Sequence, residues 1–300
     1  MNAKAAAFAS ATTASHGRLY DYYELSKPRV VAMVLVTTLA GFYLGAAGQF
    51  HFMLAFNLLI GTALSAAGTL ALNQYMERET DALMLRTQHR PLPDGRMRPA
   101  EALTFGLATL VAGLVYLAVA ANALSAGVTA TIAVVYLLGY TPLKRVTWMC
   151  DVVGAIPGAL PPVAGWAAAR GSLAAEPLVM FAIMFLWQLP HTFAVARLYR
   201  EDYARAGIKL LPDDARWGNP SDLVVILAGL ALIGVGTIPT FMGFAGVPYL
   251  VVAALLGLGM MLFAIAMIRD PDRPQPARRL LMASLLYLPI VLLMMVIDKL

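Results

Sequence analysis

Three residues that could bind a metal ion recur every four positions in the stretch NQYMERETD. They are Asn73, Glu77 and Asp81. In a helix each is turned only about 40° from the one before, so all three lie on one face. An amide oxygen and two carboxylates are hard donors of the kind that Mg²⁺ prefers, particularly where a substrate phosphate completes the coordination. The spacing indicates a Mg²⁺ and phosphate site, although a solvated helix end would show the same pattern.

A second acidic residue, Asp202 in YREDYARAGIKLLP, is the candidate partner of this site as a fourth metal ligand. Basic residues accompany both stretches and the intervening YTPLKR, and they are candidates for binding a diphosphate, because Arg suits bidentate phosphate contacts. They are Arg78, Arg86, Arg90, Lys144, Arg145, Arg205 and Lys209. Acidic and basic groups above an apolar interior suit an amphiphile with a diphosphate head and a lipid tail. Ordinary interfacial charges are the alternative.

The segment FLWQLPHTF places Gln188 and His191 inside an apolar stretch. Polar groups within a membrane are costly and indicate function by default. A histidine bonded to a carbonyl that Pro190 leaves free is the alternative. Trp187 fits either an aromatic position in the core or a contact with a planar ligand.

The elements that carry these residues are apolar and long. The 300 residues are 60% hydrophobic and 13% charged, against about 25% charged in soluble domains. Stretches of about 20 apolar residues, enough to cross a bilayer, cover residues 29–47, 52–72, 102–120, 124–140, 151–168, 177–197, 222–240, 247–268 and 280–298. We expect an all-α integral membrane protein of about nine transmembrane helices around a central cavity, as a single domain over 18–300 behind a flexible tail at 1–17.

The distribution of charge predicts the orientation. Of the 22 Lys and Arg residues, only Arg170 and Lys299 fall outside the N-terminal segment and the connections after the second, fourth, sixth and eighth spans. This asymmetry places the N-terminus in the cytoplasm, the C-terminus outside and the charged site at the cytoplasmic face. It also accounts for the net charge of +5 without nucleic acid. The single cysteine, Cys150, gives no support to a disulfide or a zinc site.

Two long polar connections, residues 73–100 and 198–221, each follow an outside-to-inside helix, four helices apart. This spacing suggests an internal duplication that would bring both loops over one cavity. Between them, DVVGAIPGALPPVAGW carries three prolines among small residues. It predicts a kinked helix that either packs tightly or widens the cavity for a bulky ligand.

Three segments carry a resemblance to the UbiA superfamily of intramembrane prenyltransferases: NQYMERETDALMLRTQHRPLP, YTPLKR with GAIPGALPPVAGW, and WQLPHTFAVARLYREDYARAGIKLLP. The last resembles the branch that farnesylates heme. The resemblance implies that heme B and farnesyl diphosphate are the substrates, within membrane lipid, and that heme O is the product. It further implies that Asn73, Glu77, Asp81 and Asp202 hold Mg²⁺ diphosphate and that His191, Trp187 and Gln188 contact heme. The product would pass to a heme-modifying enzyme or a terminal oxidase.

The chain departs from the family pattern at two positions. Glu77 stands where the superfamily usually has Asp, and Ala206 follows Asp202 where a second Asp is usual. One well-held Mg²⁺, or a second that is held loosely, is therefore easier to defend than a symmetrical pair. Prenylation of an aromatic quinone precursor is the alternative activity. A transporter is disfavoured, because the carboxylates gather at one face instead of the midplane.

Overall fold

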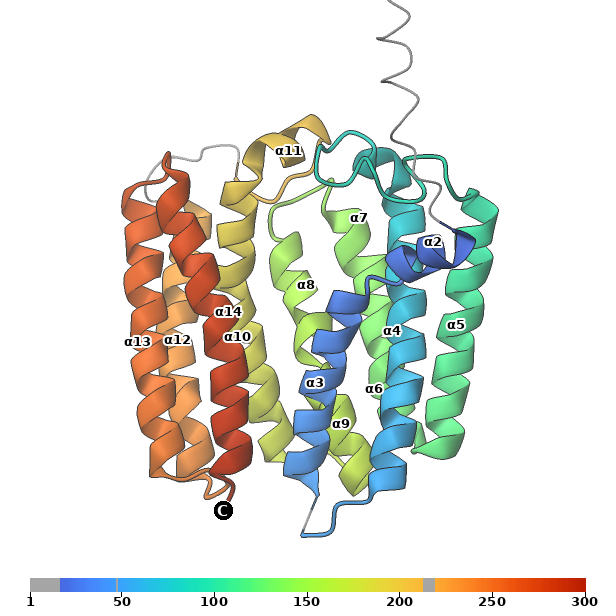
Figure 1. The fold of residues 1–300 in the computed structure, drawn as a ribbon. Coiled ribbons are helices and arrows are strands. Elements are labelled where there is room, and N and C mark those ends of the chain that lie inside the picture. The colour runs from blue at the N-terminus through green and yellow to red at the C-terminus, as the bar shows by residue number, and fades with distance from the viewer. Residues whose placement is uncertain (1–16, 47, 213–218) are drawn as a thin grey trace, which may run out of the picture.

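The computed structural model describes residues 17–46, 48–212 and 219–300, and every regular element in these ranges is helical. Nine segments there are long and apolar enough to cross a membrane, which confirms the predicted all-α membrane fold (Figure 1). They are α3 (Pro28–Gly45), α4 (Phe52–Asp81), α5 (Pro99–Ala120), Ala123–Leu143, Cys150–Arg170, α10 (Ala175–Leu198), α12 (Pro220–Phe241), α13 (Val247–Arg269) and α14 (Pro274–Ile297). Apart from Gly17, the predicted tail at 1–17 lies outside the described residues.

Two of these segments are interrupted. Ala123–Leu143 consists of α6 (Ala123–Val134), a π-helical turn η1 (Val135–Tyr140) and α7 (Thr141–Leu143). Cys150–Arg170 consists of α8 (Cys150–Ala159) and α9 (Pro161–Arg170), which meet at Leu160. Consecutive prolines at 161 and 162 cannot donate backbone hydrogen bonds, so the helix breaks where the sequence predicts a kink.

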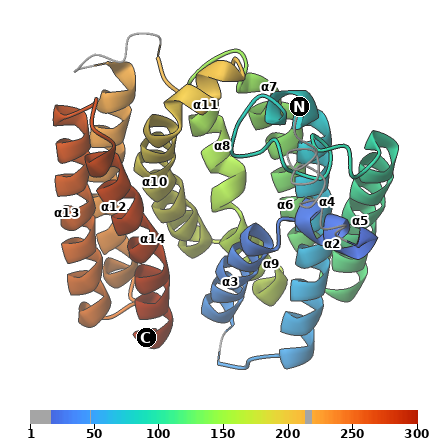
Figure 2. The same ribbon diagram turned by 45° about the horizontal axis from the view of Figure 1, so that its top comes forward.

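The helices form two groups (Figures 1 and 2). In the first group α4 packs on α5 and α3 packs on α9, and in the second α10, α12, α13 and α14 pack on one another. Glycines permit very close approach in the first group. A Cβ at Gly68 of α4 would lie 2.4 Å from the backbone nitrogen of Leu110 in α5, and one at Gly165 of α9 would lie 1.9 Å from the carbonyl oxygen of Thr38 in α3.

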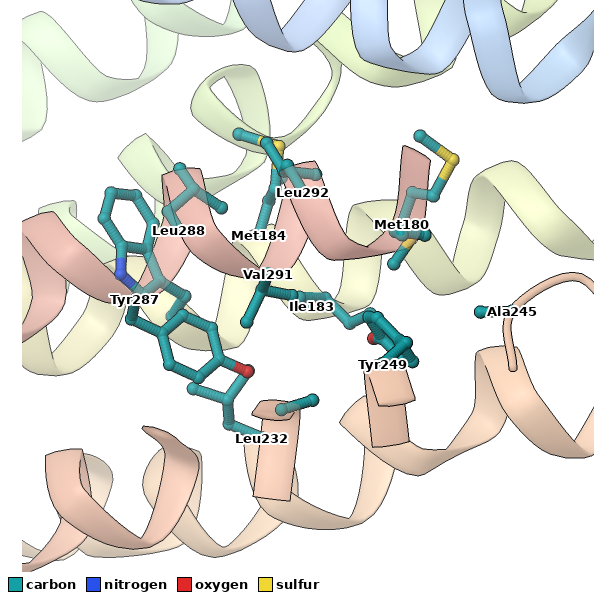
Figure 3. Packing of buried hydrophobic residues seen from close by; sticks show 14 of the residues in the cluster. Met180, Ile183, Met184, Leu232, Ala245, Tyr249, Tyr287, Leu288, Val291 and Leu292 are labelled. Atoms are coloured by element: carbon teal, nitrogen blue, oxygen red, sulfur yellow. The ribbon is translucent and has the colours of Figure 1, made fainter. Parts of the chain in front are cut away.

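The second group is filled by side chains. Met180 and Ile183 of α10 pack with Leu232 of α12, Tyr249 of α13 and Tyr287 of α14, and each is at most 1% exposed (Figure 3). Two short helices, α2 (Arg18–Leu25) and α11 (Arg200–Arg205), lie at the end of the bundle that also holds both long connections (Figure 1). The bundle therefore presents its polar segments at one face.

Candidate active site

The last two turns of α4 carry the three residues that the sequence spacing singled out. The helix is 30 residues long, and about 20 suffice to cross a bilayer, so its final turns extend beyond the apolar core. Asn73 and Asp81 are each 1% exposed. Because the helix is unbroken from Phe52 to Asp81, Asn73, Glu77 and Asp81 share one face as predicted.

Each of these three side chains contacts a cation. Glu77 Oε1 pairs with Lys144 Nζ at 2.7 Å, and Asp81 Oδ2 pairs with Arg90 at 2.6 Å. Asn73 Oδ1 accepts a hydrogen bond from Lys27 Nζ at 3.1 Å. The alternating acidic and basic groups form the charged mouth, which we define as Lys27, Asn73, Glu77, Asp81, Arg90 and Lys144.

Lys27 was missed by sequence reasoning, which began the first span at residue 29. It directly precedes Pro28 at the start of α3 and has a left-handed backbone conformation with φ of 47°, which is uncommon for a non-glycine residue. Burial, together with the nearby charges of Arg90 and Lys144, lowers the pKa of Lys27 to about 7. A second missed residue, Thr141, accepts a hydrogen bond from Asn73 Nδ2 at 3.1 Å.

Asp202 lies in α11 and joins the two long connections. Its Oδ1 accepts hydrogen bonds from Arg205 and from the backbone nitrogen of Leu85, the latter at 3.2 Å. Burial acts to raise the pKa of Asp202, but these hydrogen bonds outweigh it and hold the pKa below its ordinary value. Among the described residues no three His, Cys, Asp or Glu side chains group closely enough to hold a metal ion.

The remaining predicted diphosphate ligands lie around the mouth. Arg86 donates to the Tyr203 hydroxyl at 3.3 Å and lies 5.2 Å from the ring centre of Tyr199, so it ties the first connection to α11. Arg78 pairs with its exposed neighbour Glu79. Arg145, Arg205 and Lys209 are exposed. Of the predicted cations, Arg90 and Lys144 therefore pair with the proposed metal ligands Asp81 and Glu77.

A mostly apolar cavity of about 260 Å³ lies beside the charged mouth. It is lined by residues of α3, α4, the segments Ala123–Leu143 and Cys150–Arg170, and α10. Tyr140 of the cavity wall lies against Lys144, whose Nζ is 4.4 Å from its ring centre. In the π-helical turn that carries Tyr140, the Tyr136 carbonyl accepts hydrogen bonds from both the backbone nitrogen and the Oγ1 atom of Thr141, the latter at 2.8 Å. Tyr140 therefore borders both the cavity, which it lines, and the charged mouth, whose Lys144 it contacts.

The three residues predicted to contact heme point in different directions. Gln188 lines the cavity. His191 Nδ1 lies 2.8 Å from Ser284 Oγ of α14, and its ring stacks on Trp187 with 5.1 Å between ring centres. Trp187 donates to the Ser284 carbonyl at 2.8 Å. Of the three, Gln188 faces the cavity, while Trp187 and His191 contact α14.

The family model described as the UbiA prenyltransferase family matches residues 34–286. The chain belongs to the UbiA prenyltransferase family. One curated relative, the "Protoheme IX farnesyltransferase" of Solibacter usitatus (strain Ellin6076), is 44% identical in an alignment that covers 93% of this chain and 98% of the relative. The protein of the same name from Koribacter versatilis (strain Ellin345) is 38% identical, covering 94% of each.

Solved structures share the fold of this UbiA prenyltransferase. One, described as digeranylgeranylglyceryl phosphate synthase, superposes with a TM-score of 0.79 at 16% identity, over 94% of this chain and 99% of the other. Another, a UbiA homolog from Archaeoglobus fulgidus bound to GPP and Mg²⁺, has a TM-score of 0.66 at 18% identity, over 92% and 99%. At these identities the likeness extends to the fold alone.

Proposed function

We propose that this chain transfers a farnesyl group from farnesyl diphosphate to a vinyl group of heme B, with addition of water, to give heme O. The observation that carries the proposal is that an apolar cavity and the charged mouth lie side by side, with Tyr140 lining the cavity and contacting Lys144 of the mouth. This arrangement matches a substrate with an apolar tail and a diphosphate head. The choice of heme as the acceptor rests on the name of relatives that match nearly the whole chain.

The charged mouth would hold the diphosphate. Lys27, Arg90 and Lys144 supply positive charge around the end of α4, and Arg86 stands at the junction of the two connections. Preorganised cations stabilise a leaving diphosphate as its charge develops. The apolar cavity wall excludes water from the allylic cation that departure leaves behind.

Asn73, Glu77, Asp81 and Asp202 are the proposed Mg²⁺ ligands. The donor set on α4 fits the ion, because its oxygens are hard donors on consecutive turns of one helix face. With no group of three acidic, histidine or cysteine side chains in the described part of the chain, phosphate oxygens would have to complete the coordination. Mg²⁺ bound there would neutralise charge on the departing diphosphate. One such ion is proposed, since Ala206 replaces the second acid after Asp202.

Heme would enter beside α10. Gln188 faces the cavity and is the proposed contact from that helix. Trp187 and His191, which contact α14, would reach heme only where it approaches the contact between α10 and α14. The heme O formed would then pass to a heme-modifying enzyme or a terminal oxidase.

The proposed setting is the bacterial inner membrane, with the N-terminus and the charged mouth in the cytoplasm and the C-terminus outside. Lys299 lies at the opposite end from the mouth, where its Nζ donates to the carbonyls of Tyr43 and Ala46 at the end of α3. This separation of charges agrees with the excess of basic residues on cytoplasmic segments.

The proposal is tested with purified protein in detergent, given heme B, farnesyl diphosphate and Mg²⁺. Extracted hemes are separated by chromatography and identified by mass spectrometry. We expect a heme that has gained a farnesyl group and one water, and we expect EDTA to abolish it. Unchanged heme, together with a farnesylated product in a parallel assay that supplies an aromatic acid instead of heme B, would assign the chain to quinone-precursor chemistry. A farnesylated heme that still forms in the presence of EDTA would contradict the proposed Mg²⁺ dependence.

A further inference from the structure

Asp151 is a buried carboxylate with no role in the site described so far. It lies in the first turn of α8 and is 3% exposed. It lines the apolar cavity beside the charged mouth and is the one carboxylate among the described residues that do so. Its Oδ2 atom has no hydrogen-bond partner among the described residues.

Burying an oxygen of this kind without a hydrogen-bond partner destabilises the folded protein. A carboxylate removed from water costs free energy unless it is paired or hydrogen-bonded, and the great majority of buried polar atoms do have partners. An ionisable residue inside a membrane-spanning segment indicates function by default. The unpartnered oxygen is therefore available to a molecule that enters the cavity.

The space around Asp151 suits a small polar molecule. The cavity-lining face of α8 continues through Gly154, against which the Tyr140 ring packs, and through Gly158. Gln188 of α10 lies against Gly158, and Thr192, one helical turn nearer the mouth, also lines the cavity. Because α8 and α10 run in opposite directions (Figure 1), Thr192 lies at a level between Gln188 and Asp151.

We propose that Asp151 is the general base that accepts a proton from the water molecule added during the reaction. This inference rests on the proposed function. A bond forms between C1 of the farnesyl group and the terminal vinyl carbon, while the bond to diphosphate breaks. The inner vinyl carbon becomes cationic, the oxygen of water attacks it, and one water proton passes to the Asp151 carboxylate. The product is the hydroxyethylfarnesyl side chain.

A cation that is not captured has a second outcome. It can lose a proton from the neighbouring CH₂ group and form an alkene, whose mass is lower by one water. Both products carry the farnesyl group, so their ratio reports the hydration step separately from prenyl transfer. General bases typically contribute about 10²–10⁴-fold to the step they assist.

The test is the product ratio of Asp151→Asn under the assay conditions given above. The substitution keeps the shape and removes the uncompensated buried charge, so folding should be retained. We expect heme still to be farnesylated, with the ratio of hydrated to alkene product at least about tenfold lower than in the wild type. Asp272→Asn, at an exposed carboxylate near the surface, is the control and should leave the ratio unchanged.

Asp151→Glu is the second variant, because it retains a carboxylate. It should still give mainly hydrated product; predominance of the alkene in both variants would assign the effect to packing and overturn the proposal. An unchanged ratio in Asp151→Asn would overturn it directly, as would loss of all prenyl transfer with diphosphate binding intact. If wild-type protein gives no farnesylated heme, it is the proposed function that fails.

Discussion

At the residue scale, Asp81 offers the most direct test of the charged mouth. It is 1% exposed and pairs with Arg90, and it is a proposed Mg²⁺ ligand. Asp81→Asn keeps the shape but removes the charge that would hold the ion. We expect kcat to fall by about 10²-fold or more, the loss typical when one electrostatic stabiliser of a transition state is removed. Turnover of heme B by the purified variant measures this.

Glu79→Gln provides the matched control. Glu79 lies on the same last turns of α4, but its side chain is 75% exposed and pairs with Arg78. An exposed ion pair contributes little, so this variant should keep wild-type turnover. Wild-type activity in Asp81→Asn would contradict the assignment of Asp81 as a Mg²⁺ ligand. Equal losses in both variants would point to a general effect of charge at this helix end.

The sequence could predict some residues of the mouth and not others, for a physical reason. Asn73, Glu77 and Asp81 share a helix face through a local period, so their spacing sufficed. Lys27 contacts Asn73 from 46 positions away in the sequence. It directly precedes α3 and itself has the left-handed backbone conformation. No local pattern encodes such a contact, although a lysine immediately before the proline that starts a span was a usable signal.

At the element scale, the close contact between α4 and α5 predicts that a larger side chain at Gly68 destabilises the protein. A Cβ at Gly68 would lie 2.4 Å from the Leu110 nitrogen and 2.6 Å from the Gly106 oxygen, and backbone cannot rotate away. Overpacking typically costs about 1–3 kcal/mol, so Gly68→Leu should lower the unfolding temperature in detergent. Gly127→Leu is the control, because a Cβ at Gly127 meets nothing within 4 Å. Equal melting of both variants would contradict tight packing at Gly68.

The lengths of elements were predicted less well than their number. Apolar composition ends near residue 72, but α4 continues to Asp81, because its polar last turns are paired with cations and need no lipid. The last span, α14, starts at Pro274, whereas its apolar stretch starts at residue 280. Hydropathy indicates which residues lie in the membrane, and a helix can extend beyond them. The π-helical turn at Val135–Tyr140 has no signal in composition at all.

At the scale of the whole molecule, the nine spans place two sets of loops at opposite ends (Figure 1). One end holds the charged mouth, α11 and the long connections. The other holds short turns, including the one after Arg170, and the C-terminus. The orientation of the protein in the membrane therefore decides whether the mouth faces the cytoplasm. It can be tested by labelling one residue at each end of the bundle.

Single cysteines provide that test, because the native Cys150 is free but fully buried and gives little background labelling. Ala100 at the start of α5 and Ser172 after α9 are both exposed and lie at opposite ends of the bundle. We expect a membrane-impermeant maleimide to label Ser172→Cys in intact bacterial spheroplasts, and to label Ala100→Cys only after lysis. The wild type, treated identically, sets the background. The reverse pattern would place the mouth outside the cell, where heme B and farnesyl diphosphate made in the cytoplasm could not reach it directly, and the proposed orientation would be wrong.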